Sequence, residues 1–238
     1  MIDFSVRSLV PRCAEFGLDL DDMAVKRLEK YGNMLVEWNE KFNLTAITEP
    51  CEVLYKHFYD CLLFFSAIQV PNGAKIIDVG AGAGFPSLVL KIARPDINIT
   101  MLDSLSKRIT FLSEVLKELG LEGDALHLRA EDGGRDIKLR EKFDIACARA
   151  VANLSVLSEY CVPFVKVGGL FVAMKGSAAA EEVDAAINAF SILGMDTPKI
   201  ICRDLRENEK RSFVVAKKIS QTPPKYPRNS AKIKKAVL

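Results

Sequence analysis

Three glycines at alternate positions are the residues of this chain that point most directly to chemistry. Gly80, Gly82 and Gly84 follow a short apolar run. The run is Ile76 to Val79, and Pro86 can begin a helix just beyond the glycines. Glycine is needed where a backbone turns sharply and lets a ligand lie directly against it. In an open α/β sheet such a turn lies at the carboxyl end of a strand, where ligands bind. The segment therefore predicts a binding site for a small cofactor.

The spacing of the glycines separates the cofactor classes that use such a turn. Dinucleotide-binding folds prefer G-x-G-x-x-G, but here the third glycine comes one position early and Phe85 fills the dinucleotide position. A phosphate-binding P-loop is excluded because no G-K-[ST] follows. The alternating form suits S-adenosylmethionine, which has no phosphate but has a carboxylate and an amino group to hold. A purely structural glycine turn is the alternative.

An acidic residue after the next apolar run supplies the second half of the expected site. Asp103 follows the run 97–102 and lies about 20 residues beyond the glycines, where it can accept hydrogen bonds from both ribose hydroxyls. Alternatively, the same side chain caps a helix beginning near Ser106. Ala130 and Glu131 follow the third predicted strand, at the place expected for an adenine base.

Charged residues near the ends of later runs are further candidates. Arg149 ends the run 143–148 and offers a guanidinium to a cofactor carboxylate or an RNA phosphate, with a surface ion pair as the alternative. Lys175 ends the next run and is a candidate phosphate contact. His57 lies three residues before Asp60 on a helix, which favours a structural His–Asp pair over a catalytic base.

Alternating strands and helices are predicted over the greater part of the chain. Strands are expected at 76–79, 97–102, 125–128, 143–148, 170–174, 199–202 and 212–216. Helices are expected between them, near 86–93, 107–119, 153–162 and 178–193. This alternation predicts an α/β fold with a mainly parallel, doubly wound sheet.

The first third of the chain is predicted to be helical. One helix begins after Asp21 and carries Tyr31, Trp38 and Phe42 on one face, which favours core packing over stacking on bases. A second amphipathic helix is expected over about 52–68. We divide the chain into a helical N-terminal extension (1–70), a cofactor-binding core (71–220) and a basic C-terminal tail (221–238).

Charge is distributed unevenly along the 238 residues. Hydrophobic residues make up 49% and charged residues 27%, an ordinary globular composition that excludes a disordered chain. The net charge is +2, yet nine basic and no acidic residues lie from Lys210 to Leu238, while the rest carries 24 basic and 31 acidic residues. The basic end predicts an anionic macromolecular partner, with a solubilising tail as the alternative. The residues expected to meet RNA phosphates are Lys175, Arg211, Lys225, Arg228, Lys232, Lys234 and Lys235.

The cysteines and the N-terminal residues bear on the compartment. The N-terminus lacks the features of a signal peptide, and the longest apolar stretch is too short to cross a bilayer. We expect a cytoplasmic monomer with no membrane partner, and scattered cysteines that are reduced core residues and not metal ligands. These are Cys13, Cys51, Cys61, Cys147, Cys161 and Cys202.

Several motifs spread over nearly the whole chain resemble those of one family. They are Trp38-Asn39 with Lys41 to Ile47, His57-Phe58 with Asp60, Asp78 to Gly80 with Gly82 to Pro86, Leu102 to Leu105, Arg129 to Glu131, Arg149 to Ala152, Lys175-Gly176 and Tyr226 to Arg228. The chain thereby resembles the bacterial 16S ribosomal RNA small subunit methyltransferase G family, also called glucose-inhibited division protein B. It departs from the usual pattern at Ser87, where that family usually has glycine.

The resemblance implies a fold, an activity and a set of contacts. The fold would be a Rossmann-like class I methyltransferase sheet of seven strands behind a helical extension. The activity would be methyl transfer from S-adenosyl-L-methionine to N7 of a guanine in the small-subunit RNA, in naked rRNA or in the small ribosomal subunit. Taken with the glycine pattern, it gives an expected cofactor-binding set of Gly80, Gly82, Gly84, Phe85, Asp103, Ser104, Leu105, Ala130, Glu131 and Arg149.

Guanine N7 carries a free lone pair, so alignment of the reacting atoms is expected to suffice and no catalytic base is assigned. Two other functions stay open at this point. One is a nicotinamide- or flavin-dependent oxidoreductase, which the glycine spacing opposes. The other is a catalytically silent RNA-binding protein built on a methyltransferase scaffold.

Overall fold

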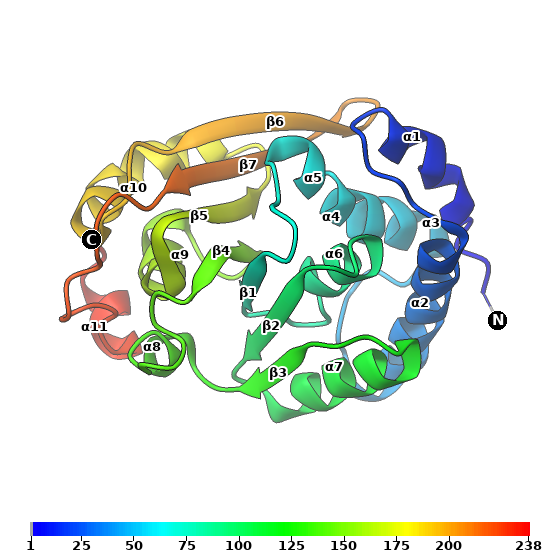
Figure 1. Ribbon diagram of the computed structural model, residues 1–238, viewed down its shortest axis with the longest axis horizontal. Coiled ribbons are helices and arrows are strands. Elements are labelled where there is room, and N and C mark those ends of the chain that lie inside the picture. The colour runs from blue at the N-terminus through cyan, green and yellow to red at the C-terminus, as the bar shows by residue number, and fades with distance from the viewer. Residues whose placement is uncertain (1) are drawn as a thin grey trace.

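A seven-stranded sheet lies between two layers of helices (Figure 1). The structure is a computed structural model that describes residues 2–238. The strands are β1 (Lys75–Val79), β2 (Asn98–Asp103), β3 (Asp124–His127), β4 (Phe143–Arg149), β5 (Val165–Lys175), β6 (Lys199–Arg206) and β7 (Glu209–Lys217). Their order is β3-β2-β1-β4-β5-β7-β6, with β7 antiparallel to both of its neighbours and the other pairs parallel. The expected mainly parallel, seven-stranded sheet is confirmed.

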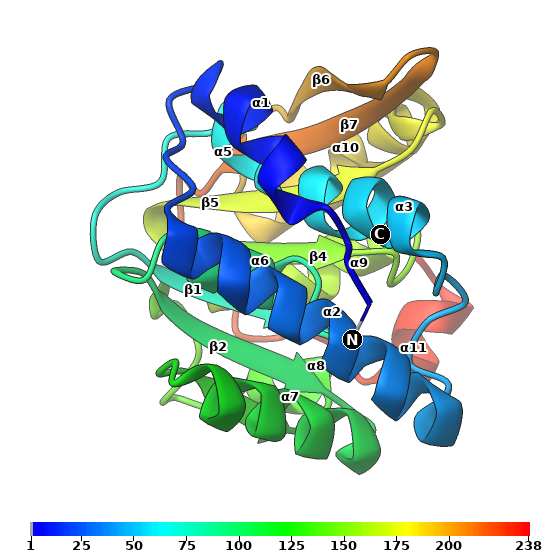
Figure 2. The ribbon, with the colours of Figure 1, turned by 90° about the vertical axis from the view of Figure 1, so that its right-hand side faces the viewer.

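The helices divide by their place in the sequence, as Figures 1 and 2 show. Those before β3 pack with one face of the sheet and form the larger core: η1 (Val6–Leu9), α1 (Val10–Ala14), α2 (Asp22–Phe42), α3 (Pro50–Val53), η2 (Leu54–Tyr59), α4 (Asp60–Leu62), α5 (Phe64–Ala67), α6 (Ser87–Ala93) and α7 (Ser106–Leu119). Those after β3 lie with the other face: α8 (Ala130–Gly133), α9 (Leu154–Cys161), η3 (Val162–Phe164), α10 (Ala179–Leu193) and α11 (Ser230–Lys235).

Strand β1 is apolar almost throughout because helices cover both of its faces. Successive side chains point to opposite faces, so Ile76 enters the core of the first helical layer and Ile77 that of the second. Central parallel strands are covered on both sides and therefore carry unbroken apolar runs. This is the pattern that made the strands predictable.

The predicted single helix over 52–68 is interrupted. Pro50 stands in the first turn of α3, where Glu49 caps it, but the backbone then widens into a π-helix, η2, before α4 and α5 follow. A π turn adds a residue to the helical turn and shifts the side chains that follow; such turns are frequent at functional sites. His57 and Asp60 lie in and just after η2.

The predicted helix ends are confirmed, whereas the predicted burial of the cysteines is only partly correct. Asp21 caps α2 by accepting a hydrogen bond from the Ala24 amide, and Gly120 ends α7 in the left-handed conformation, both as expected. Four cysteines are buried, but Cys51 and Cys202 are exposed, so the expectation of core positions is wrong for these two. No helix within residues 2–238 has both the length and the apolar character needed to cross a bilayer.

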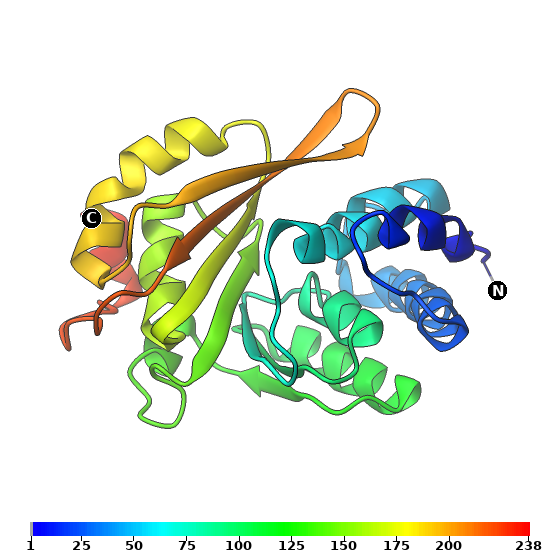
Figure 3. The ribbon, with the colours of Figure 1, turned by 45° about the horizontal axis from the view of Figure 1, so that its top comes forward.

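The C-terminal residues are not a loose tail. Tyr226 is buried in the second core, and Ile233 is fully buried on α11. Helix α11 packs on α9, and Figures 1 and 2 show it beside α8 and α9. By contrast, the tip of the β6–β7 hairpin extends beyond the rest of the sheet toward the N-terminal helices (Figure 3).

Candidate functional site

A cavity of about 400 Å³ opens at the carboxyl ends of the central strands. Its walls come from the ends of β1 and β2, from the segments that follow β3 and β4, and from α9 and α11. Five of the residues expected to hold the cofactor line it: Gly80, Asp103, Ser104, Ala130 and Glu131. This is the edge where ligands bind in open α/β sheets.

All three glycines have a positive φ, a backbone conformation that favours glycine, and two of them also lie too close to a neighbour for a Cβ. A Cβ at Gly80 would lie 2.8 Å from the Val151 side chain, so glycine there allows a close approach between two walls of the cavity. A Cβ at Gly84 would lie 2.4 Å from Leu88, so this glycine lets the loop pack on α6. A Cβ at Gly82 would meet nothing closer than 3.8 Å, so at this position only the φ of +60° favours glycine. Gly80 is thus the one of the three that lines the cavity.

Asp103 is the best-supported polar contact for a ligand. Its Oδ2 accepts hydrogen bonds from the Gly82 amide at 2.9 Å and from Arg108 at 3.2 Å. Its Oδ1 accepts one from the Leu105 amide at 2.9 Å, which leaves further acceptor capacity on that oxygen. The alternative role as a helix cap is not observed, because α7 is preceded by Leu105 and has no side-chain cap.

Asp78, immediately before the glycine loop, is fully buried. Its Oδ2 accepts from the amide and the hydroxyl of Ser87, at 3.2 and 2.6 Å, whereas Oδ1 has no hydrogen-bond partner among residues 2–238. Burial raises the pKa of Asp78 to about 7. Ser87, where the resembled family usually has glycine, therefore supports this carboxylate beneath the loop.

A second cavity, of about 380 Å³, lies beside the first. Its lining includes Ile47, Met174 and Gly176, together with the charged or polar side chains of Lys56, His57, Asp60, Arg149, Lys175 and Arg211. Ala150, which follows β4 and has a φ of +56°, lines both cavities. The two cavities are therefore neighbours across the β4 end.

Arg149 is the last residue of β4 and lines the second cavity, not the first, so its contact with a cofactor stays a prediction. Its Nη1 donates to Asp60 at 3.0 Å and to the Lys56 carbonyl at 2.8 Å, and the guanidinium lies 4.8 Å from the centre of the Phe85 ring. The side chain is only 16% exposed. Arg149 thus forms a buried ion pair that joins β4 to the N-terminal helices, not a surface pair. Gly82, Gly84, Phe85 and Leu105 also lie outside the cavity lining, and their direct contact with a cofactor stays a prediction.

The expected His57–Asp60 pair is wrong, because Arg149 separates the two side chains. Nδ1 of His57 lies 3.2 Å from Arg149, and Nε2 lies 2.9 Å from the Thr45 hydroxyl. The ring stacks on Phe85 with 4.3 Å between ring centres. Burial, with the charge of Arg149, lowers the pKa of His57 to about 3, so the imidazole is neutral at physiological pH.

Tyr31 connects the helical layer to the glycine loop. It is fully buried, packs against Phe58, Phe85 and Phe111, and donates its hydroxyl to the Ala83 carbonyl. The expected core role is confirmed for Tyr31. Trp38 and Phe42, also expected in the core, are partly buried and stack on each other at its edge.

Three of the cations expected to meet RNA already have acidic partners. Lys175 donates to Glu182 at 2.7 Å, Arg211 to Asp60 at 3.0 Å, and Arg228 to Glu159 at 2.6 Å. No acidic residue lies between Lys210 and Leu238, but in the folded structure Glu159 on α9 pairs with Arg228. The four lysines that are left, all exposed, are Lys225, Lys232, Lys234 and Lys235.

Several residues in the first cavity were not predicted to lie there. Arg108, Val156 and Tyr160 line it from α7 and α9, and Ser230 and Lys234 line it from α11. The hydrogen bond from Arg108 to Asp103 spans five residues and could have been considered from spacing alone. The contributions of α9 and α11 depend on tertiary packing and had no local signal.

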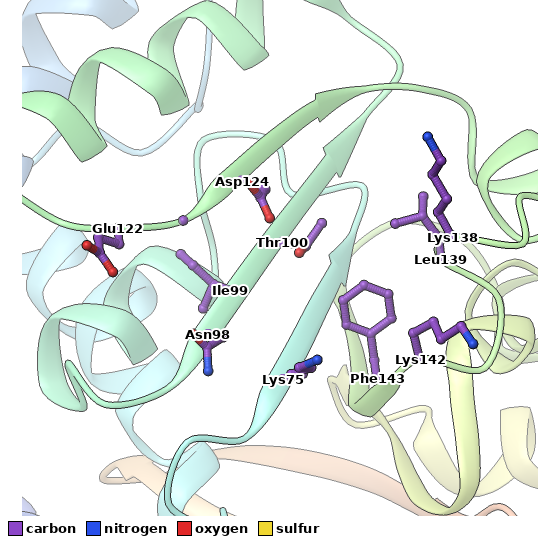
Figure 4. A pocket seen from close by; sticks show the side chains of 11 residues that line it. Lys75, Asn98, Ile99, Thr100, Glu122, Asp124, Lys138, Leu139, Lys142 and Phe143 are labelled. Atoms are coloured by element: carbon purple, nitrogen blue, oxygen red, sulfur yellow. The ribbon is translucent and has the colours of Figure 1, made fainter.

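A larger groove, of about 460 Å³, lies at the opposite edge of the sheet (Figure 4). It is lined by residues near the starts of β1 to β4, among them Lys75 and Phe143, and by Lys138 and Lys142 from the segment before β4. Ligands of open α/β sheets bind at the carboxyl ends of strands. The smaller cavity at those ends is therefore the candidate site.

Comparisons with known proteins agree with this geometry. The family model described as GidB, rRNA small subunit methyltransferase G, matches residues 24–211. A protein named ribosomal RNA small subunit methyltransferase G from Clostridium botulinum (strain ATCC 19397 / Type A) is 47% identical over 225 residues, 94% of each chain. A protein of the same name from Desulforamulus reducens is 48% identical over 218 residues, 91% of each chain.

Solved structures share the fold at low sequence identity. An S-adenosylmethionine-dependent O-methyltransferase from Thermotoga maritima superposes with a TM-score of 0.52 at 15% identity, covering 79% of this chain and 72% of the other. A precorrin-6Y C5,15-methyltransferase from Geobacter metallireducens gives 0.51 at 15% identity, covering 66% and 87%. The fold is thus that of Rossmann-like methyltransferases. With the family model spanning most of the chain and relatives nearly half identical along it, the chain belongs to the rRNA small subunit methyltransferase G family.

Proposed function

We propose that this protein transfers a methyl group from S-adenosylmethionine to N7 of a guanine in small-subunit ribosomal RNA. The observation that carries the proposal is the pair of neighbouring cavities that share Ala150. One has the lining expected for the cofactor, and the other combines apolar and cationic side chains. A transfer reaction needs two such sites whose ligands meet at a common wall.

The residues of the first cavity fit S-adenosylmethionine. Asp103 keeps acceptor capacity on Oδ1 for a ribose hydroxyl, and its position is fixed by hydrogen bonds from Gly82, Leu105 and Arg108. The approach of Gly80 to Val151 leaves no space there for a larger side chain. When bound, the cofactor supplies an electrophilic methyl group on its sulfonium sulfur. The chain's part is to hold the ribose at Asp103 and the adenine near Ala130 and Glu131.

The second cavity fits a base of a single-stranded RNA segment. Proteins read such RNA by taking an unstacked base into a pocket with stacking and polar edges, while cations hold the phosphates. Ile47 and Met174 offer apolar contacts, and Arg149, Lys175 and Arg211 bring positive charge to the same wall. Because acidic partners already orient these cations, little side-chain entropy remains to be lost on binding.

No general base is required by this chemistry. Guanine N7 has a lone pair available without loss of a proton, so the protein's contribution is alignment. His57 lies at the second cavity but is neutral and has hydrogen-bond neighbours at both ring nitrogens. Its stacking on Phe85 makes it part of the wall between the glycine loop and the base site.

Labelled methyl transfer to small subunits from a strain lacking the protein tests the proposal. We expect one methyl group per RNA. Because N7 methylation makes the imidazole ring of guanine cationic and susceptible to chemical reduction, reduction of the product followed by strand cleavage should reveal one new scission site. Running naked rRNA and intact subunits side by side identifies the substrate form. The Asp103→Ala variant is the control for cofactor-dependent labelling. Label on a ribose hydroxyl or an exocyclic nitrogen would overturn the N7 assignment, and no label on any of these RNAs would overturn the activity.

A further inference from the structure

The C-terminal end of the chain supplies a wall of the cofactor cavity. Ser230 and Lys234, both on α11, line it together with Val156 and Tyr160 of α9. The Tyr160 and Ser230 hydroxyls are 3.3 Å apart and connect the two helices. Ser230 stands 80 positions beyond Ala150, the residue just after β4 that lines the same cavity.

A buried ion pair holds this segment in place. Glu159 on α9 is fully buried, and its carboxylate accepts hydrogen bonds from the Arg228 amide at 2.7 Å, from Nε at 2.9 Å and from Nη2 at 2.6 Å. A buried carboxylate without a partner is strongly unfavourable. Arg228 is therefore fixed two residues before α11 begins at Ser230.

Further contacts fix the chain on both sides of that pair. Arg140 donates to the carbonyls of Thr222 and Tyr226, at 2.7 and 2.8 Å. The Pro227 ring covers Gly134, where a Cβ would approach it to 2.9 Å. Beyond the pair, Ile233 is fully buried. Since the anchors lie on α9 and in the segment between α8 and β4, the wall is built into the fold.

We propose that residues 226–235 form the wall at the adenosine end of the S-adenosylmethionine site, with Ser230 and Lys234 as cofactor-contacting residues. This inference rests on the proposed cofactor. Asp103, Ala130, Glu131 and Lys234 line one and the same cavity, so a cofactor with its ribose at Asp103 and its adenine near Ala130 and Glu131 would share that cavity with the Lys234 side chain. The Lys234 ammonium has three donors, which suit the acceptor nitrogens of an adenine ring.

Calorimetric binding of S-adenosylmethionine by the full chain and its variants tests the assignment. Lys234→Ala is expected to weaken binding about three- to tenfold, as for the loss of one partly exposed hydrogen bond. Lys235→Ala is the matched control, because it removes the same charge from the same helix at a residue outside the cavity lining, and it should bind as the wild type does.

A deletion of residues 230–238 extends the test while keeping the Arg228–Glu159 pair. We expect at least tenfold weaker binding, since a whole wall is lost. Circular dichroism and thermal melting report whether the shortened chain is folded. If it is not folded, the comparison of Lys234→Ala with Lys235→Ala decides whether α11 contacts the cofactor. Equal affinities of Lys234→Ala and wild type would overturn the inference and leave the proposed function intact. A wild-type protein that does not bind S-adenosylmethionine would instead overturn the proposed function.

Discussion

The carboxylate of Asp103 has its orientation set before a ligand binds. The Gly82 amide and Arg108 fix one oxygen, and the Leu105 amide fixes the other, while the side chain is only 2% exposed. Such preorganisation avoids the entropic cost of ordering the side chain during binding. The same contacts make Asp103 part of the glycine loop's own support.

Replacing Asp103 with alanine should weaken S-adenosylmethionine binding by about 1.5–3 kcal/mol, the range for a hydrogen bond to a charged group. Isothermal calorimetry measures this directly. Asp103→Asn keeps one acceptor oxygen and should lie between the alanine variant and the wild type. If both variants bind with wild-type affinity while their folds are intact, Asp103 does not hold the ribose.

His57 should make the protein sensitive to acid. Its pKa is lowered to about 3 in the folded chain, against about 6.5 in an unfolded one. The unfolded state therefore binds the proton first as the pH falls from 6.5 to 3, and the free energy of unfolding decreases by up to about 1.4 kcal/mol per pH unit. Above pH 6.5 this contribution is constant.

Urea unfolding at a series of pH values checks this expectation. His57→Gln should flatten the decline below pH 6.5 relative to the wild type, whereas His127→Gln, at an exposed histidine, should keep it. Between about pH 6.5 and 8.5, His57→Gln should leave the shape of the single-turnover rate profile unchanged, because His57 is already neutral there. A histidine-like pKa in the wild-type profile that disappears in His57→Gln would show that His57 is a general base.

At the scale of elements, the β6–β7 hairpin braces the interrupted helix that follows Pro50. Arg203 donates to the hydroxyl and carbonyl of Ser66, at 2.9 and 2.6 Å. Arg206 pairs with Glu52 and Arg211 with Asp60. Three arginines of one hairpin thus contact the start, middle and end of the segment that presents His57.

Arg203→Ala should lower the free energy of unfolding by about 1 kcal/mol, since the guanidinium is partly exposed and its two bonds to Ser66 are exchanged for water. Chemical denaturation measures the change. Lys210→Ala removes an exposed cation from the same hairpin and serves as the control, with an expected change of less than about 0.5 kcal/mol. Equal stabilities of the two variants would mean that the hairpin does not brace the helix.

Elements with a repeating local signal were predictable, and those decided by packing were not. The central strands are apolar on both faces and were placed correctly, and α2 and α7 had recognisable ends at Asp21 and Gly120. The π turn at η2 has no periodic signature of its own. Helix α11 is only six residues long, four of them Ser or Lys, and Ile233 is its one buried residue.

In the candidate site, too, the residues with a local sequence signal were predictable and those positioned by long-range packing were not. The glycine loop and Asp103 are adjacent in sequence to the strands that carry them, so pattern and position sufficed. The partners of Arg149 and Arg228 could not be inferred, because Asp60 lies 89 residues from the first and Glu159 lies 69 from the second. Sequence spacing within a helix suggested a His57–Asp60 contact, but a guanidinium from across the fold occupies that place.

At the scale of the whole molecule, four lysines that form no ion pair within residues 2–238 lie close together in the sequence, between positions 225 and 235. Lys225, Lys232 and Lys235 are exposed and lie outside the cofactor cavity lining. Each phosphate contact with single-stranded RNA contributes about 0.7 to the slope of log affinity against log salt concentration. If these lysines contact RNA, changing all three to glutamine should lower the slope by about 2 units.

Filter binding or fluorescence anisotropy over a range of salt concentrations measures this slope. The matched control is a triple glutamine variant at Lys75, Lys138 and Lys142, exposed lysines of the groove at the opposite edge of the sheet. S-adenosylmethionine affinity should be unchanged in both variants. If both triple variants reduce the slope equally, the effect is one of net charge and not of a binding surface.

The place of α11 in the cofactor cavity has a consequence for the order of events during synthesis. Domains form from their N-terminal end as the chain emerges. The helical layer, the glycine loop and Asp103 can assemble early, but Arg228, Ser230 and Lys234 are synthesised more than 120 residues after Asp103. A nascent chain therefore lacks one wall of the proposed cofactor pocket until Lys234 has emerged from the ribosome, and we expect it to hold S-adenosylmethionine only weakly before that point.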